Sequence, residues 1–151
     1  MRTKDFHGVF SLLLTPFEKD GTLDWEGYDR YVDWQLSMEP QGLFAVCGSS
    51  EMKWLTLDER IELAKRAVDR AGPTPVVASA NIENNPSDHL EELHRMANTG
   101  VKAVVLVPPN GMGRDQNVLK EYLGGLIEAS PLPVILYEWP LNHPHFISAQ
   151  I

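Results

Sequence analysis

The chain has 151 residues, of which 43% are hydrophobic and 23% are charged, values typical of a globular domain rather than of a disordered segment. No apolar run approaches the ~20 residues that span a bilayer, so we expect no membrane partner. The formal net charge of −8 argues against a nucleic-acid partner, because phosphate binding needs clustered Lys and Arg side chains.

The N-terminal segment and the cysteine content both indicate the cytoplasm. The opening residues, MRTKDFHGVF, lack the apolar core of a signal peptide. Cys47 is the one cysteine of the chain and cannot form an internal disulfide, which is typical of a reducing compartment.

Apolar runs alternate with amphipathic segments along the whole chain. The runs predict strands within residues 8–17, 42–47, 74–80, 101–109 and 132–140. The amphipathic segments predict helices at 25–38, after Thr56, within 85–100, at 115–130 and beginning at Ser148.

Several helix ends are marked by the residue types that satisfy free main-chain groups. Asp24 and Ser87 are predicted N-caps of the first and third helices. Thr56 and Glu59 form a T-x-x-E capping box, and Gly100 predicts a left-handed helix stop.

Strands that alternate with helices predict a parallel sheet, for which two architectures compete. One is an open doubly wound sheet, and the other is a (β/α)₈ barrel. No glycine-rich phosphate loop follows the first strand, which weakens the nucleotide-binding version of the open sheet. About five strands are present, whereas a barrel of ~250 residues has eight. Either the sheet is open or the chain is part of a longer protein.

Four segments, in order, resemble the dihydrodipicolinate synthase / N-acetylneuraminate lyase family of class I aldolases and dehydratases. GVFSLLLTPFEKDGTLD is similar to the opening of that family. CGSSEMKWLTLDER is similar to its G-[ST]-T-G-E-x-x-x-L-[ST]-x-x-E signature. PVVASAN is similar to its third strand, and YEWP to its Tyr-Asn-x-Pro segment.

The resemblance implies an α/β fold of the TIM (β/α)₈ barrel family, with the site at the C-terminal ends of the strands. Residues 1–151 would be the N-terminal half of a single barrel domain with no second domain, a partial barrel of about five strands and four to five helices. The implied activity is that of a lyase, an aldolase or dehydratase, acting on a 2-oxo acid such as pyruvate or a keto-deoxy sugar acid. The family uses no cofactor and forms dimers or tetramers.

The implied mechanism needs a Schiff-base lysine on the sixth strand, and no lysine of this chain matches that place. Lys102 begins the fourth strand at the wrong end, and Lys65 and Lys120 lie in predicted helices. Lys53 lies on the correct side but in a loop, where burial to depress its pKa is not expected. The nucleophile of such an enzyme would therefore lie beyond this chain.

Gly48, Ser49 and Ser50 are the predicted binding site for a substrate carboxylate. Small residues between a strand and a helix let main-chain N–H groups approach an anion, and the two serines add hydroxyl donors. The alternative is that these hydroxyls only cap the turn. Thr15, at the end of the first strand, is a further candidate substrate contact, and its alternative is a turn hydroxyl before Pro16.

Tyr137 ends the fifth strand and is the predicted catalytic residue, because a phenol there could shuttle a proton or bond the imine. Its alternative is a rim aromatic that packs against its neighbours. Gly48 replaces a hydroxyl residue of the family signature, and Asn110 with Gly111 replaces two tyrosines of the synthases. Glu138 and Asn142 also replace an asparagine and an arginine of the synthases. A divergent lyase for another 2-oxo acid therefore fits better than a true dihydrodipicolinate synthase.

We expect no metal site, because His143 and His145, even with Glu138, fall short of a full zinc ligand set. His89 is expected on the surface, and Glu92 on a solvated helix face. Two alternatives to the lyase stay open: a catalytically inactive truncated half-barrel that binds a small carboxylate or a protein partner, and an open doubly wound sheet of unrelated function.

Overall fold

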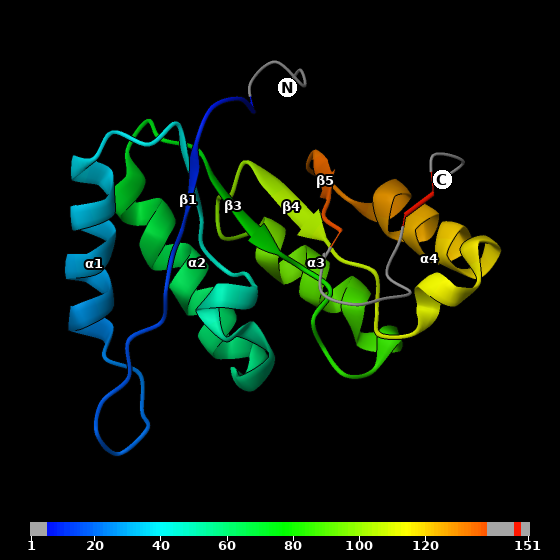
Figure 1. Cartoon of the computed structure of the whole chain (residues 1–151), viewed down its shortest axis with the longest axis horizontal. Coiled ribbons are helices and arrows are strands. Elements are labelled where there is room, and N and C mark those ends of the chain that lie inside the picture. The colour runs from blue at the N-terminus through cyan, green and yellow to red at the C-terminus, as the bar shows by residue number, and fades with distance from the viewer. Residues whose placement is uncertain (1–5, 139–146, 149–151) are drawn as a thin grey trace.

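The computed structural model describes residues 6–138 and 147–148, which form one parallel sheet flanked by helices (Figure 1). Every strand pair is parallel, and the strands lie side by side in sequence order. The strands are β1 (Phe10–Leu12), β2 (Gly42–Phe44), β3 (Val76–Ser79), β4 (Ala103–Leu106) and β5 (Val134–Leu136).

The helices connect successive strands and lie on one side of the sheet (Figure 1). They are α1 (Trp25–Ser37), α2 (Leu57–Ala71), α3 (His89–Ala97) and α4 (Gln116–Ala129). Short 3₁₀ turns precede three of these helices. Two turns, η2 (Gly48–Ser50) and η3 (Met52–Trp54), come before α2, while η4 (Pro86–Asp88) comes before α3 and η5 (Met112–Arg114) before α4.

Alternate residues of the strands supply two apolar layers. Leu43, Ala78 and Val104 pack with the helices in the larger layer. Phe44, Val77, Ala103, Val105 and Cys47 form a smaller layer on the opposite, inner face. Burial of both faces explains why β2, β3 and β4 are continuous apolar runs in the sequence.

The order of the strands decides between the two predicted architectures. A doubly wound sheet reverses its strand order and carries helices on both faces. In the described part of this chain the order never reverses, and helices cover one face (Figure 1). The partial-barrel prediction, with five strands and four helices, is therefore confirmed for the described residues. The predicted fifth helix falls largely on residues 149–151, outside the described residues.

The helix caps follow the sequence with one exception. The Asp24 carboxylate accepts a hydrogen bond from the Gly27 N–H at 2.7 Å, and Thr56 with Glu59 forms the predicted capping box. Gly100 has φ +96°, as the predicted helix stop requires. The Ser87 cap is wrong, because the turn η4 begins at the preceding proline and moves the start of α3 to His89.

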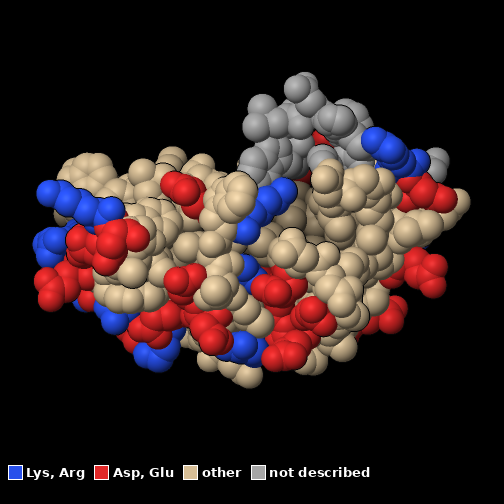
Figure 2. Space-filling model, turned by 90° about the horizontal axis from the view of Figure 1, so that it is seen from below, with Lys and Arg blue, Asp and Glu red and all other residues tan. Residues whose placement is uncertain are grey.

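Charged side chains of both signs are interspersed over the face shown in Figure 2, where the Lys and Arg side chains form no continuous basic surface. Within the part of the chain that the structure describes, no helix combines the length and apolar character needed to cross a membrane.

Candidate functional site

The segment that follows β2 forms two short turns instead of entering α2 directly. The N–H groups of Ser50 and Glu51 are bonded to the carbonyls of Cys47 and Gly48, each at 3.1 Å. Glu51 has φ +59° and separates the turns η2 and η3. The N–H groups of Gly48 and Ser49, at the start of η2, are not among the main-chain donors bonded to other described residues.

Hydrogen bonds of the Ser50 and Thr15 hydroxyls join this turn to β1 and the residues that follow it. Ser50 is fully buried; its hydroxyl lies 2.5 Å from the Leu13 carbonyl and 3.1 Å from the Ala45 carbonyl, and it accepts from the Cys47 N–H at 3.1 Å. The Thr15 hydroxyl donates to the Ser50 carbonyl at 2.7 Å. Both hydroxyls are thus engaged with the main chain. Substrate contact by these two residues stays a prediction.

A cavity of about 210 Å³ lies beside the turn, at the C-terminal ends of the strands. It is lined by the adjacent residues Gly48 and Ser49 and by Tyr137, which lies far from them in the chain. The lining is completed by Leu12, Phe44 and Cys47. Three of the predicted site residues therefore line one small cavity.

Tyr137 is placed by its main chain and by one ring contact. Its N–H donates to the Leu106 carbonyl at 2.9 Å, which continues the β4–β5 ladder by one residue. Its ring meets that of Phe44 edge-on, with centroids 6.1 Å apart and an interplanar angle of 84°. The residue keeps 40% of its surface exposed.

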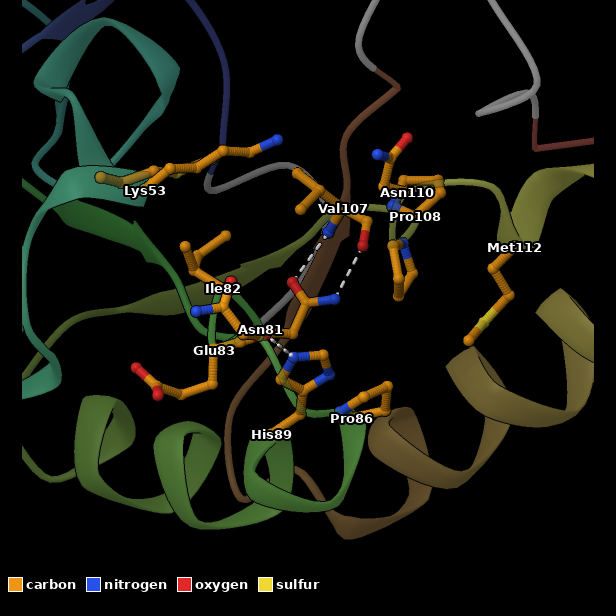
Figure 3. A pocket seen from close by; sticks show the side chains of 13 residues that line it. Lys53, Asn81, Ile82, Glu83, Pro86, His89, Val107, Pro108, Asn110 and Met112 are labelled. Atoms are coloured by element: carbon orange, nitrogen blue, oxygen red, sulfur yellow. Dashed lines mark hydrogen bonds between the residues drawn. The ribbon is translucent and has the colours of Figure 1, made fainter.

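A larger cavity of about 590 Å³ opens between the segments that follow β2, β3 and β4 (Figure 3). None of its lining residues is among the site residues predicted from the sequence. Its polar lining includes Lys53, Asn81, Glu83, His89 and Asn110. The Asn81 side chain bonds both main-chain groups of Val107, with the amide donating to the carbonyl at 2.7 Å and the oxygen accepting from the N–H at 3.0 Å.

The expectation that His89 is a surface residue is wrong, because its side chain is 2% exposed. Its Nε2 lies 2.7 Å from the Glu83 carbonyl, so this nitrogen carries the proton, and Nδ1 accepts from the Tyr122 hydroxyl at 2.6 Å. The Asn81 amide donates to the same hydroxyl at 3.0 Å. Burial raises the pKa of Tyr122 to about 12.

The expectation that Glu92 lies on a solvated face is also wrong, because Glu92 is fully buried. Burial raises the pKa of its carboxyl, and hydrogen bonds from the main chain together with the charge of Arg60 oppose that rise.

No group of three or more metal-ligating side chains occurs among residues 6–138 and 147–148. The His143 and His145 pair lies outside the described residues, and the expectation that it binds no metal stays a prediction.

Fold and site together define a class: a barrel-type α/β chain with a small cavity at the C-terminal ends of parallel strands. The family model described as the dihydrodipicolinate synthetase family matches residues 5–147. The chain belongs to this family, as the resemblance predicted.

Two relatives are enzymes named 4-hydroxy-tetrahydrodipicolinate synthase. The one from Haloarcula marismortui is 33% identical over 140 residues, which cover 93% of this chain and 45% of the relative. The one from Nitrosococcus oceani is 36% identical over 137 residues, covering 89% and 46%. The chain thus spans about half the length of the curated relatives it matches.

Solved structures agree with this assignment. A prophage protein of the dihydrodipicolinic acid synthase family from E. coli K12, in complex with pyruvate, is 26% identical with a TM-score of 0.81, over 89% of this chain and 45% of that one. Dihydrodipicolinate synthase from Aquifex aeolicus shares the fold, with a TM-score of 0.86 at 23% identity over 96% and 49%.

Proposed function

We propose that this chain is the N-terminal half of a single-domain barrel lyase, an aldolase or dehydratase that acts on a 2-oxo acid through a Schiff base. The observation that carries the proposal is the cavity that unites Gly48, Ser49 and Tyr137 at the C-terminal ends of the strands. The names of the relatives and the pyruvate held by the E. coli protein support it. Pyruvate or a keto-deoxy sugar acid is the proposed substrate class.

The turn η2 binds the substrate carboxylate in this proposal. The N–H groups of Gly48 and Ser49 donate to its oxygens, and the exposed Ser49 side chain adds a hydroxyl donor. Leu12, Phe44 and Cys47 face the carbon end of the ligand, where no hydrogen bonds are needed. Ser50 and Thr15 contribute by holding the turn against β1.

Tyr137 acts on the reacting carbonyl in this proposal. Its phenol can donate a proton to the carbonyl or imine and take it back, since the group stands at the cavity rim. The lysine that forms the imine is supplied from outside this chain. Lys102 precedes β4 at the opposite end of the sheet, and Lys53 is exposed in the turn η3.

The wider setting of the proposal is a cytoplasmic enzyme that forms a dimer or tetramer and uses no cofactor. The free thiol of Cys47 is in line with a reducing compartment. The mixed surface charge of Figure 2 offers no basic surface on that face for nucleic acid.

A second candidate is an inactive half-barrel that binds a small carboxylate. The replacement of two family tyrosines by Asn110 and Gly111 favours it, because fewer proton-transfer groups then line the site. Reading the gene past the codon for Ile151 separates the two candidates. An open frame that encodes a strand with a buried lysine supports the lyase, whereas an immediate stop codon supports the inactive half-barrel.

The binding step is tested by following the amide signals of the chain by NMR while pyruvate is added. The signals of Gly48 and Ser49 are expected to shift most, and Ser49→Ala is expected to weaken binding. Acetone, which has the carbonyl but no carboxylate, is the matched control ligand. Equal shifts with acetone, or shifts confined to residues away from η2, would contradict the carboxylate assignment.

A further inference from the structure

Arg60 is a buried cation that the proposed binding chemistry does not use. It lies in the first turn of α2, and 3% of its side chain is exposed. Its Nη1 reaches back along the chain and donates to the Leu55 carbonyl at 2.6 Å and to the Met52 carbonyl at 3.4 Å. One guanidinium nitrogen therefore closes the turn η3 from inside the protein.

The other side of the guanidinium faces two carboxylates from the next βα unit. Nη2 is ion-paired with Glu83, and Nε lies 3.3 Å from a carboxylate oxygen of Glu92. The second oxygen of Glu92 accepts from the N–H groups of Ile82 and Glu83, at 2.6 and 2.9 Å. Arg60 thus joins the segment after β2 to the segment after β3.

This junction is close in the chain to the proposed carboxylate site. The Trp54 N–H donates to the Glu51 carbonyl at 2.8 Å, and the Glu51 N–H donates to the Gly48 carbonyl at 3.1 Å. Successive hydrogen bonds therefore run from η3 back to η2. Ser50 and Thr15 hold η2 at its other side, against β1.

We propose that Arg60 is a positioning residue for the 2-oxo acid site. By holding the carbonyls of Met52 and Leu55, it fixes η3, and through η3 it fixes the direction of the Gly48 and Ser49 N–H groups. The inference rests on the proposed function for its effect on ligand binding. Its effect on the segment itself can be measured without any ligand.

A guanidinium suits this place for a geometric reason. Its planar fork presents five N–H donors in fixed directions. One group therefore bonds two carbonyls on one side and the Glu83 carboxylate on the other, while its Nε faces Glu92 in an ion pair at 3.3 Å. A lysine ammonium is a point charge that cannot span both sides, and methionine leaves the carbonyls of Met52 and Leu55 without this donor.

The test compares Arg60→Met with Tyr122→Phe. Tyr122→Phe removes two hydrogen bonds, with Asn81 and His89, at the far side of the same polar region, and neither bond involves η2 or η3. Amide hydrogen exchange of Glu51 and Trp54 is followed by NMR, and pyruvate affinity by titration. In Arg60→Met we expect exchange to be faster and pyruvate binding weaker by at least about tenfold, because two carbonyls lose a charged donor and the Glu83 and Glu92 carboxylates lose their buried cation. Tyr122→Phe leaves both within twofold.

Equal acceleration in both variants would overturn the proposal, because the effect would then be general loss of stability. Unchanged exchange in a folded Arg60→Met would overturn it too. Where Arg60→Met does not fold, Glu83→Gln removes one charge partner at constant size and is expected to change exchange in the same direction by less. No pyruvate binding by the wild-type chain would count against the proposed function, while the exchange rates would still decide the role of Arg60.

Discussion

Ser50→Ala is expected to destabilise the chain far more than the neighbouring substitution Ser49→Ala. The Ser50 hydroxyl is fully buried and meets three main-chain groups: the carbonyls of Leu13 and Ala45 and the N–H of Cys47. Without it, the Cys47 N–H is left unpaired inside the protein and the Leu13 carbonyl loses its hydroxyl donor. Each lost hydrogen bond costs about 1 kcal/mol, and a buried group left unpaired costs about 1–3 kcal/mol.

The magnitude follows from counting what the hydroxyl can do. One hydroxyl donates once, here to the Leu13 carbonyl at 2.5 Å, and accepts from the Cys47 N–H. Two hydrogen bonds and one orphaned N–H give an expected loss of about 2–4 kcal/mol in the free energy of unfolding. Ser49 is exposed, so Ser49→Ala should change stability by less than about 0.5 kcal/mol.

Urea unfolding at neutral pH, followed by circular dichroism, measures both variants against the wild type. If the slope of unfolding free energy against urea concentration is the same in variant and wild type, the lost stability comes from the native state and not from a change in the unfolded chain. The reasoning fails if Ser50→Ala loses less than about 0.5 kcal/mol, a typical surface value. It also fails if the two variants lose the same amount, since burial would then not be what separates the two serines.

Three further predictions concern other parts of the molecule. Because the native state raises the pKa of Tyr122 to about 12, it holds this proton more tightly than the unfolded chain, whose tyrosines titrate near pH ~10. Stability should therefore fall as pH rises from ~10 towards ~12, and less so in Tyr122→Phe, as thermal melts across this range would show. Gly42→Ala should cost about 1–3 kcal/mol in urea unfolding, because the new Cβ would lie 2.2 Å from the Phe10 ring. Borohydride with pyruvate should leave the mass of this chain unchanged, and an adduct mapped to any of its lysines would refute the view that the nucleophile lies elsewhere.

The parallel sheet could be predicted from the sequence. Periodicity alone could not decide whether that sheet is open and doubly wound or part of a barrel. Apolar runs of strand length, separated by capped amphipathic segments, specify parallel βα units in either architecture. What distinguishes a barrel segment is that every helix lies on the same face, and this depends on how successive units pack. The resemblance to a family supplied that information. The failed Ser87 cap shows a local limit, since Pro86 starts a 3₁₀ turn and displaces the helix start.

The candidate site shows why residue type does not settle a role. Ser49 and Ser50 are adjacent, small and hydroxylated, and both fit the same sequence argument. In a 3₁₀ turn, with three residues per turn, neighbouring side chains point about 120° apart. Ser49 is consequently exposed beside the cavity, while Ser50 faces the interior. The direction of each side chain is set by where the turn starts, and the sequence does not mark that residue.

The burial of Arg60 and Glu92 could have been predicted from their positions in the sequence. On α3, His89 and Glu92 occupy the same stripe as Leu93 and Met96, at spacings of three and four residues, and all four are buried. On α2, Arg60 shares its stripe with Leu63, Ala64 and Ala67 in the same way. A charge on the buried stripe of a helix must find a partner, because an unpaired buried charge is too costly to keep. Parallel βα units place successive helices side by side. An arginine on the buried stripe of one helix and a glutamate on the buried stripe of the next are therefore expected to pair. Arg60 and Glu92 do so, with Nε 3.3 Å from a carboxylate oxygen.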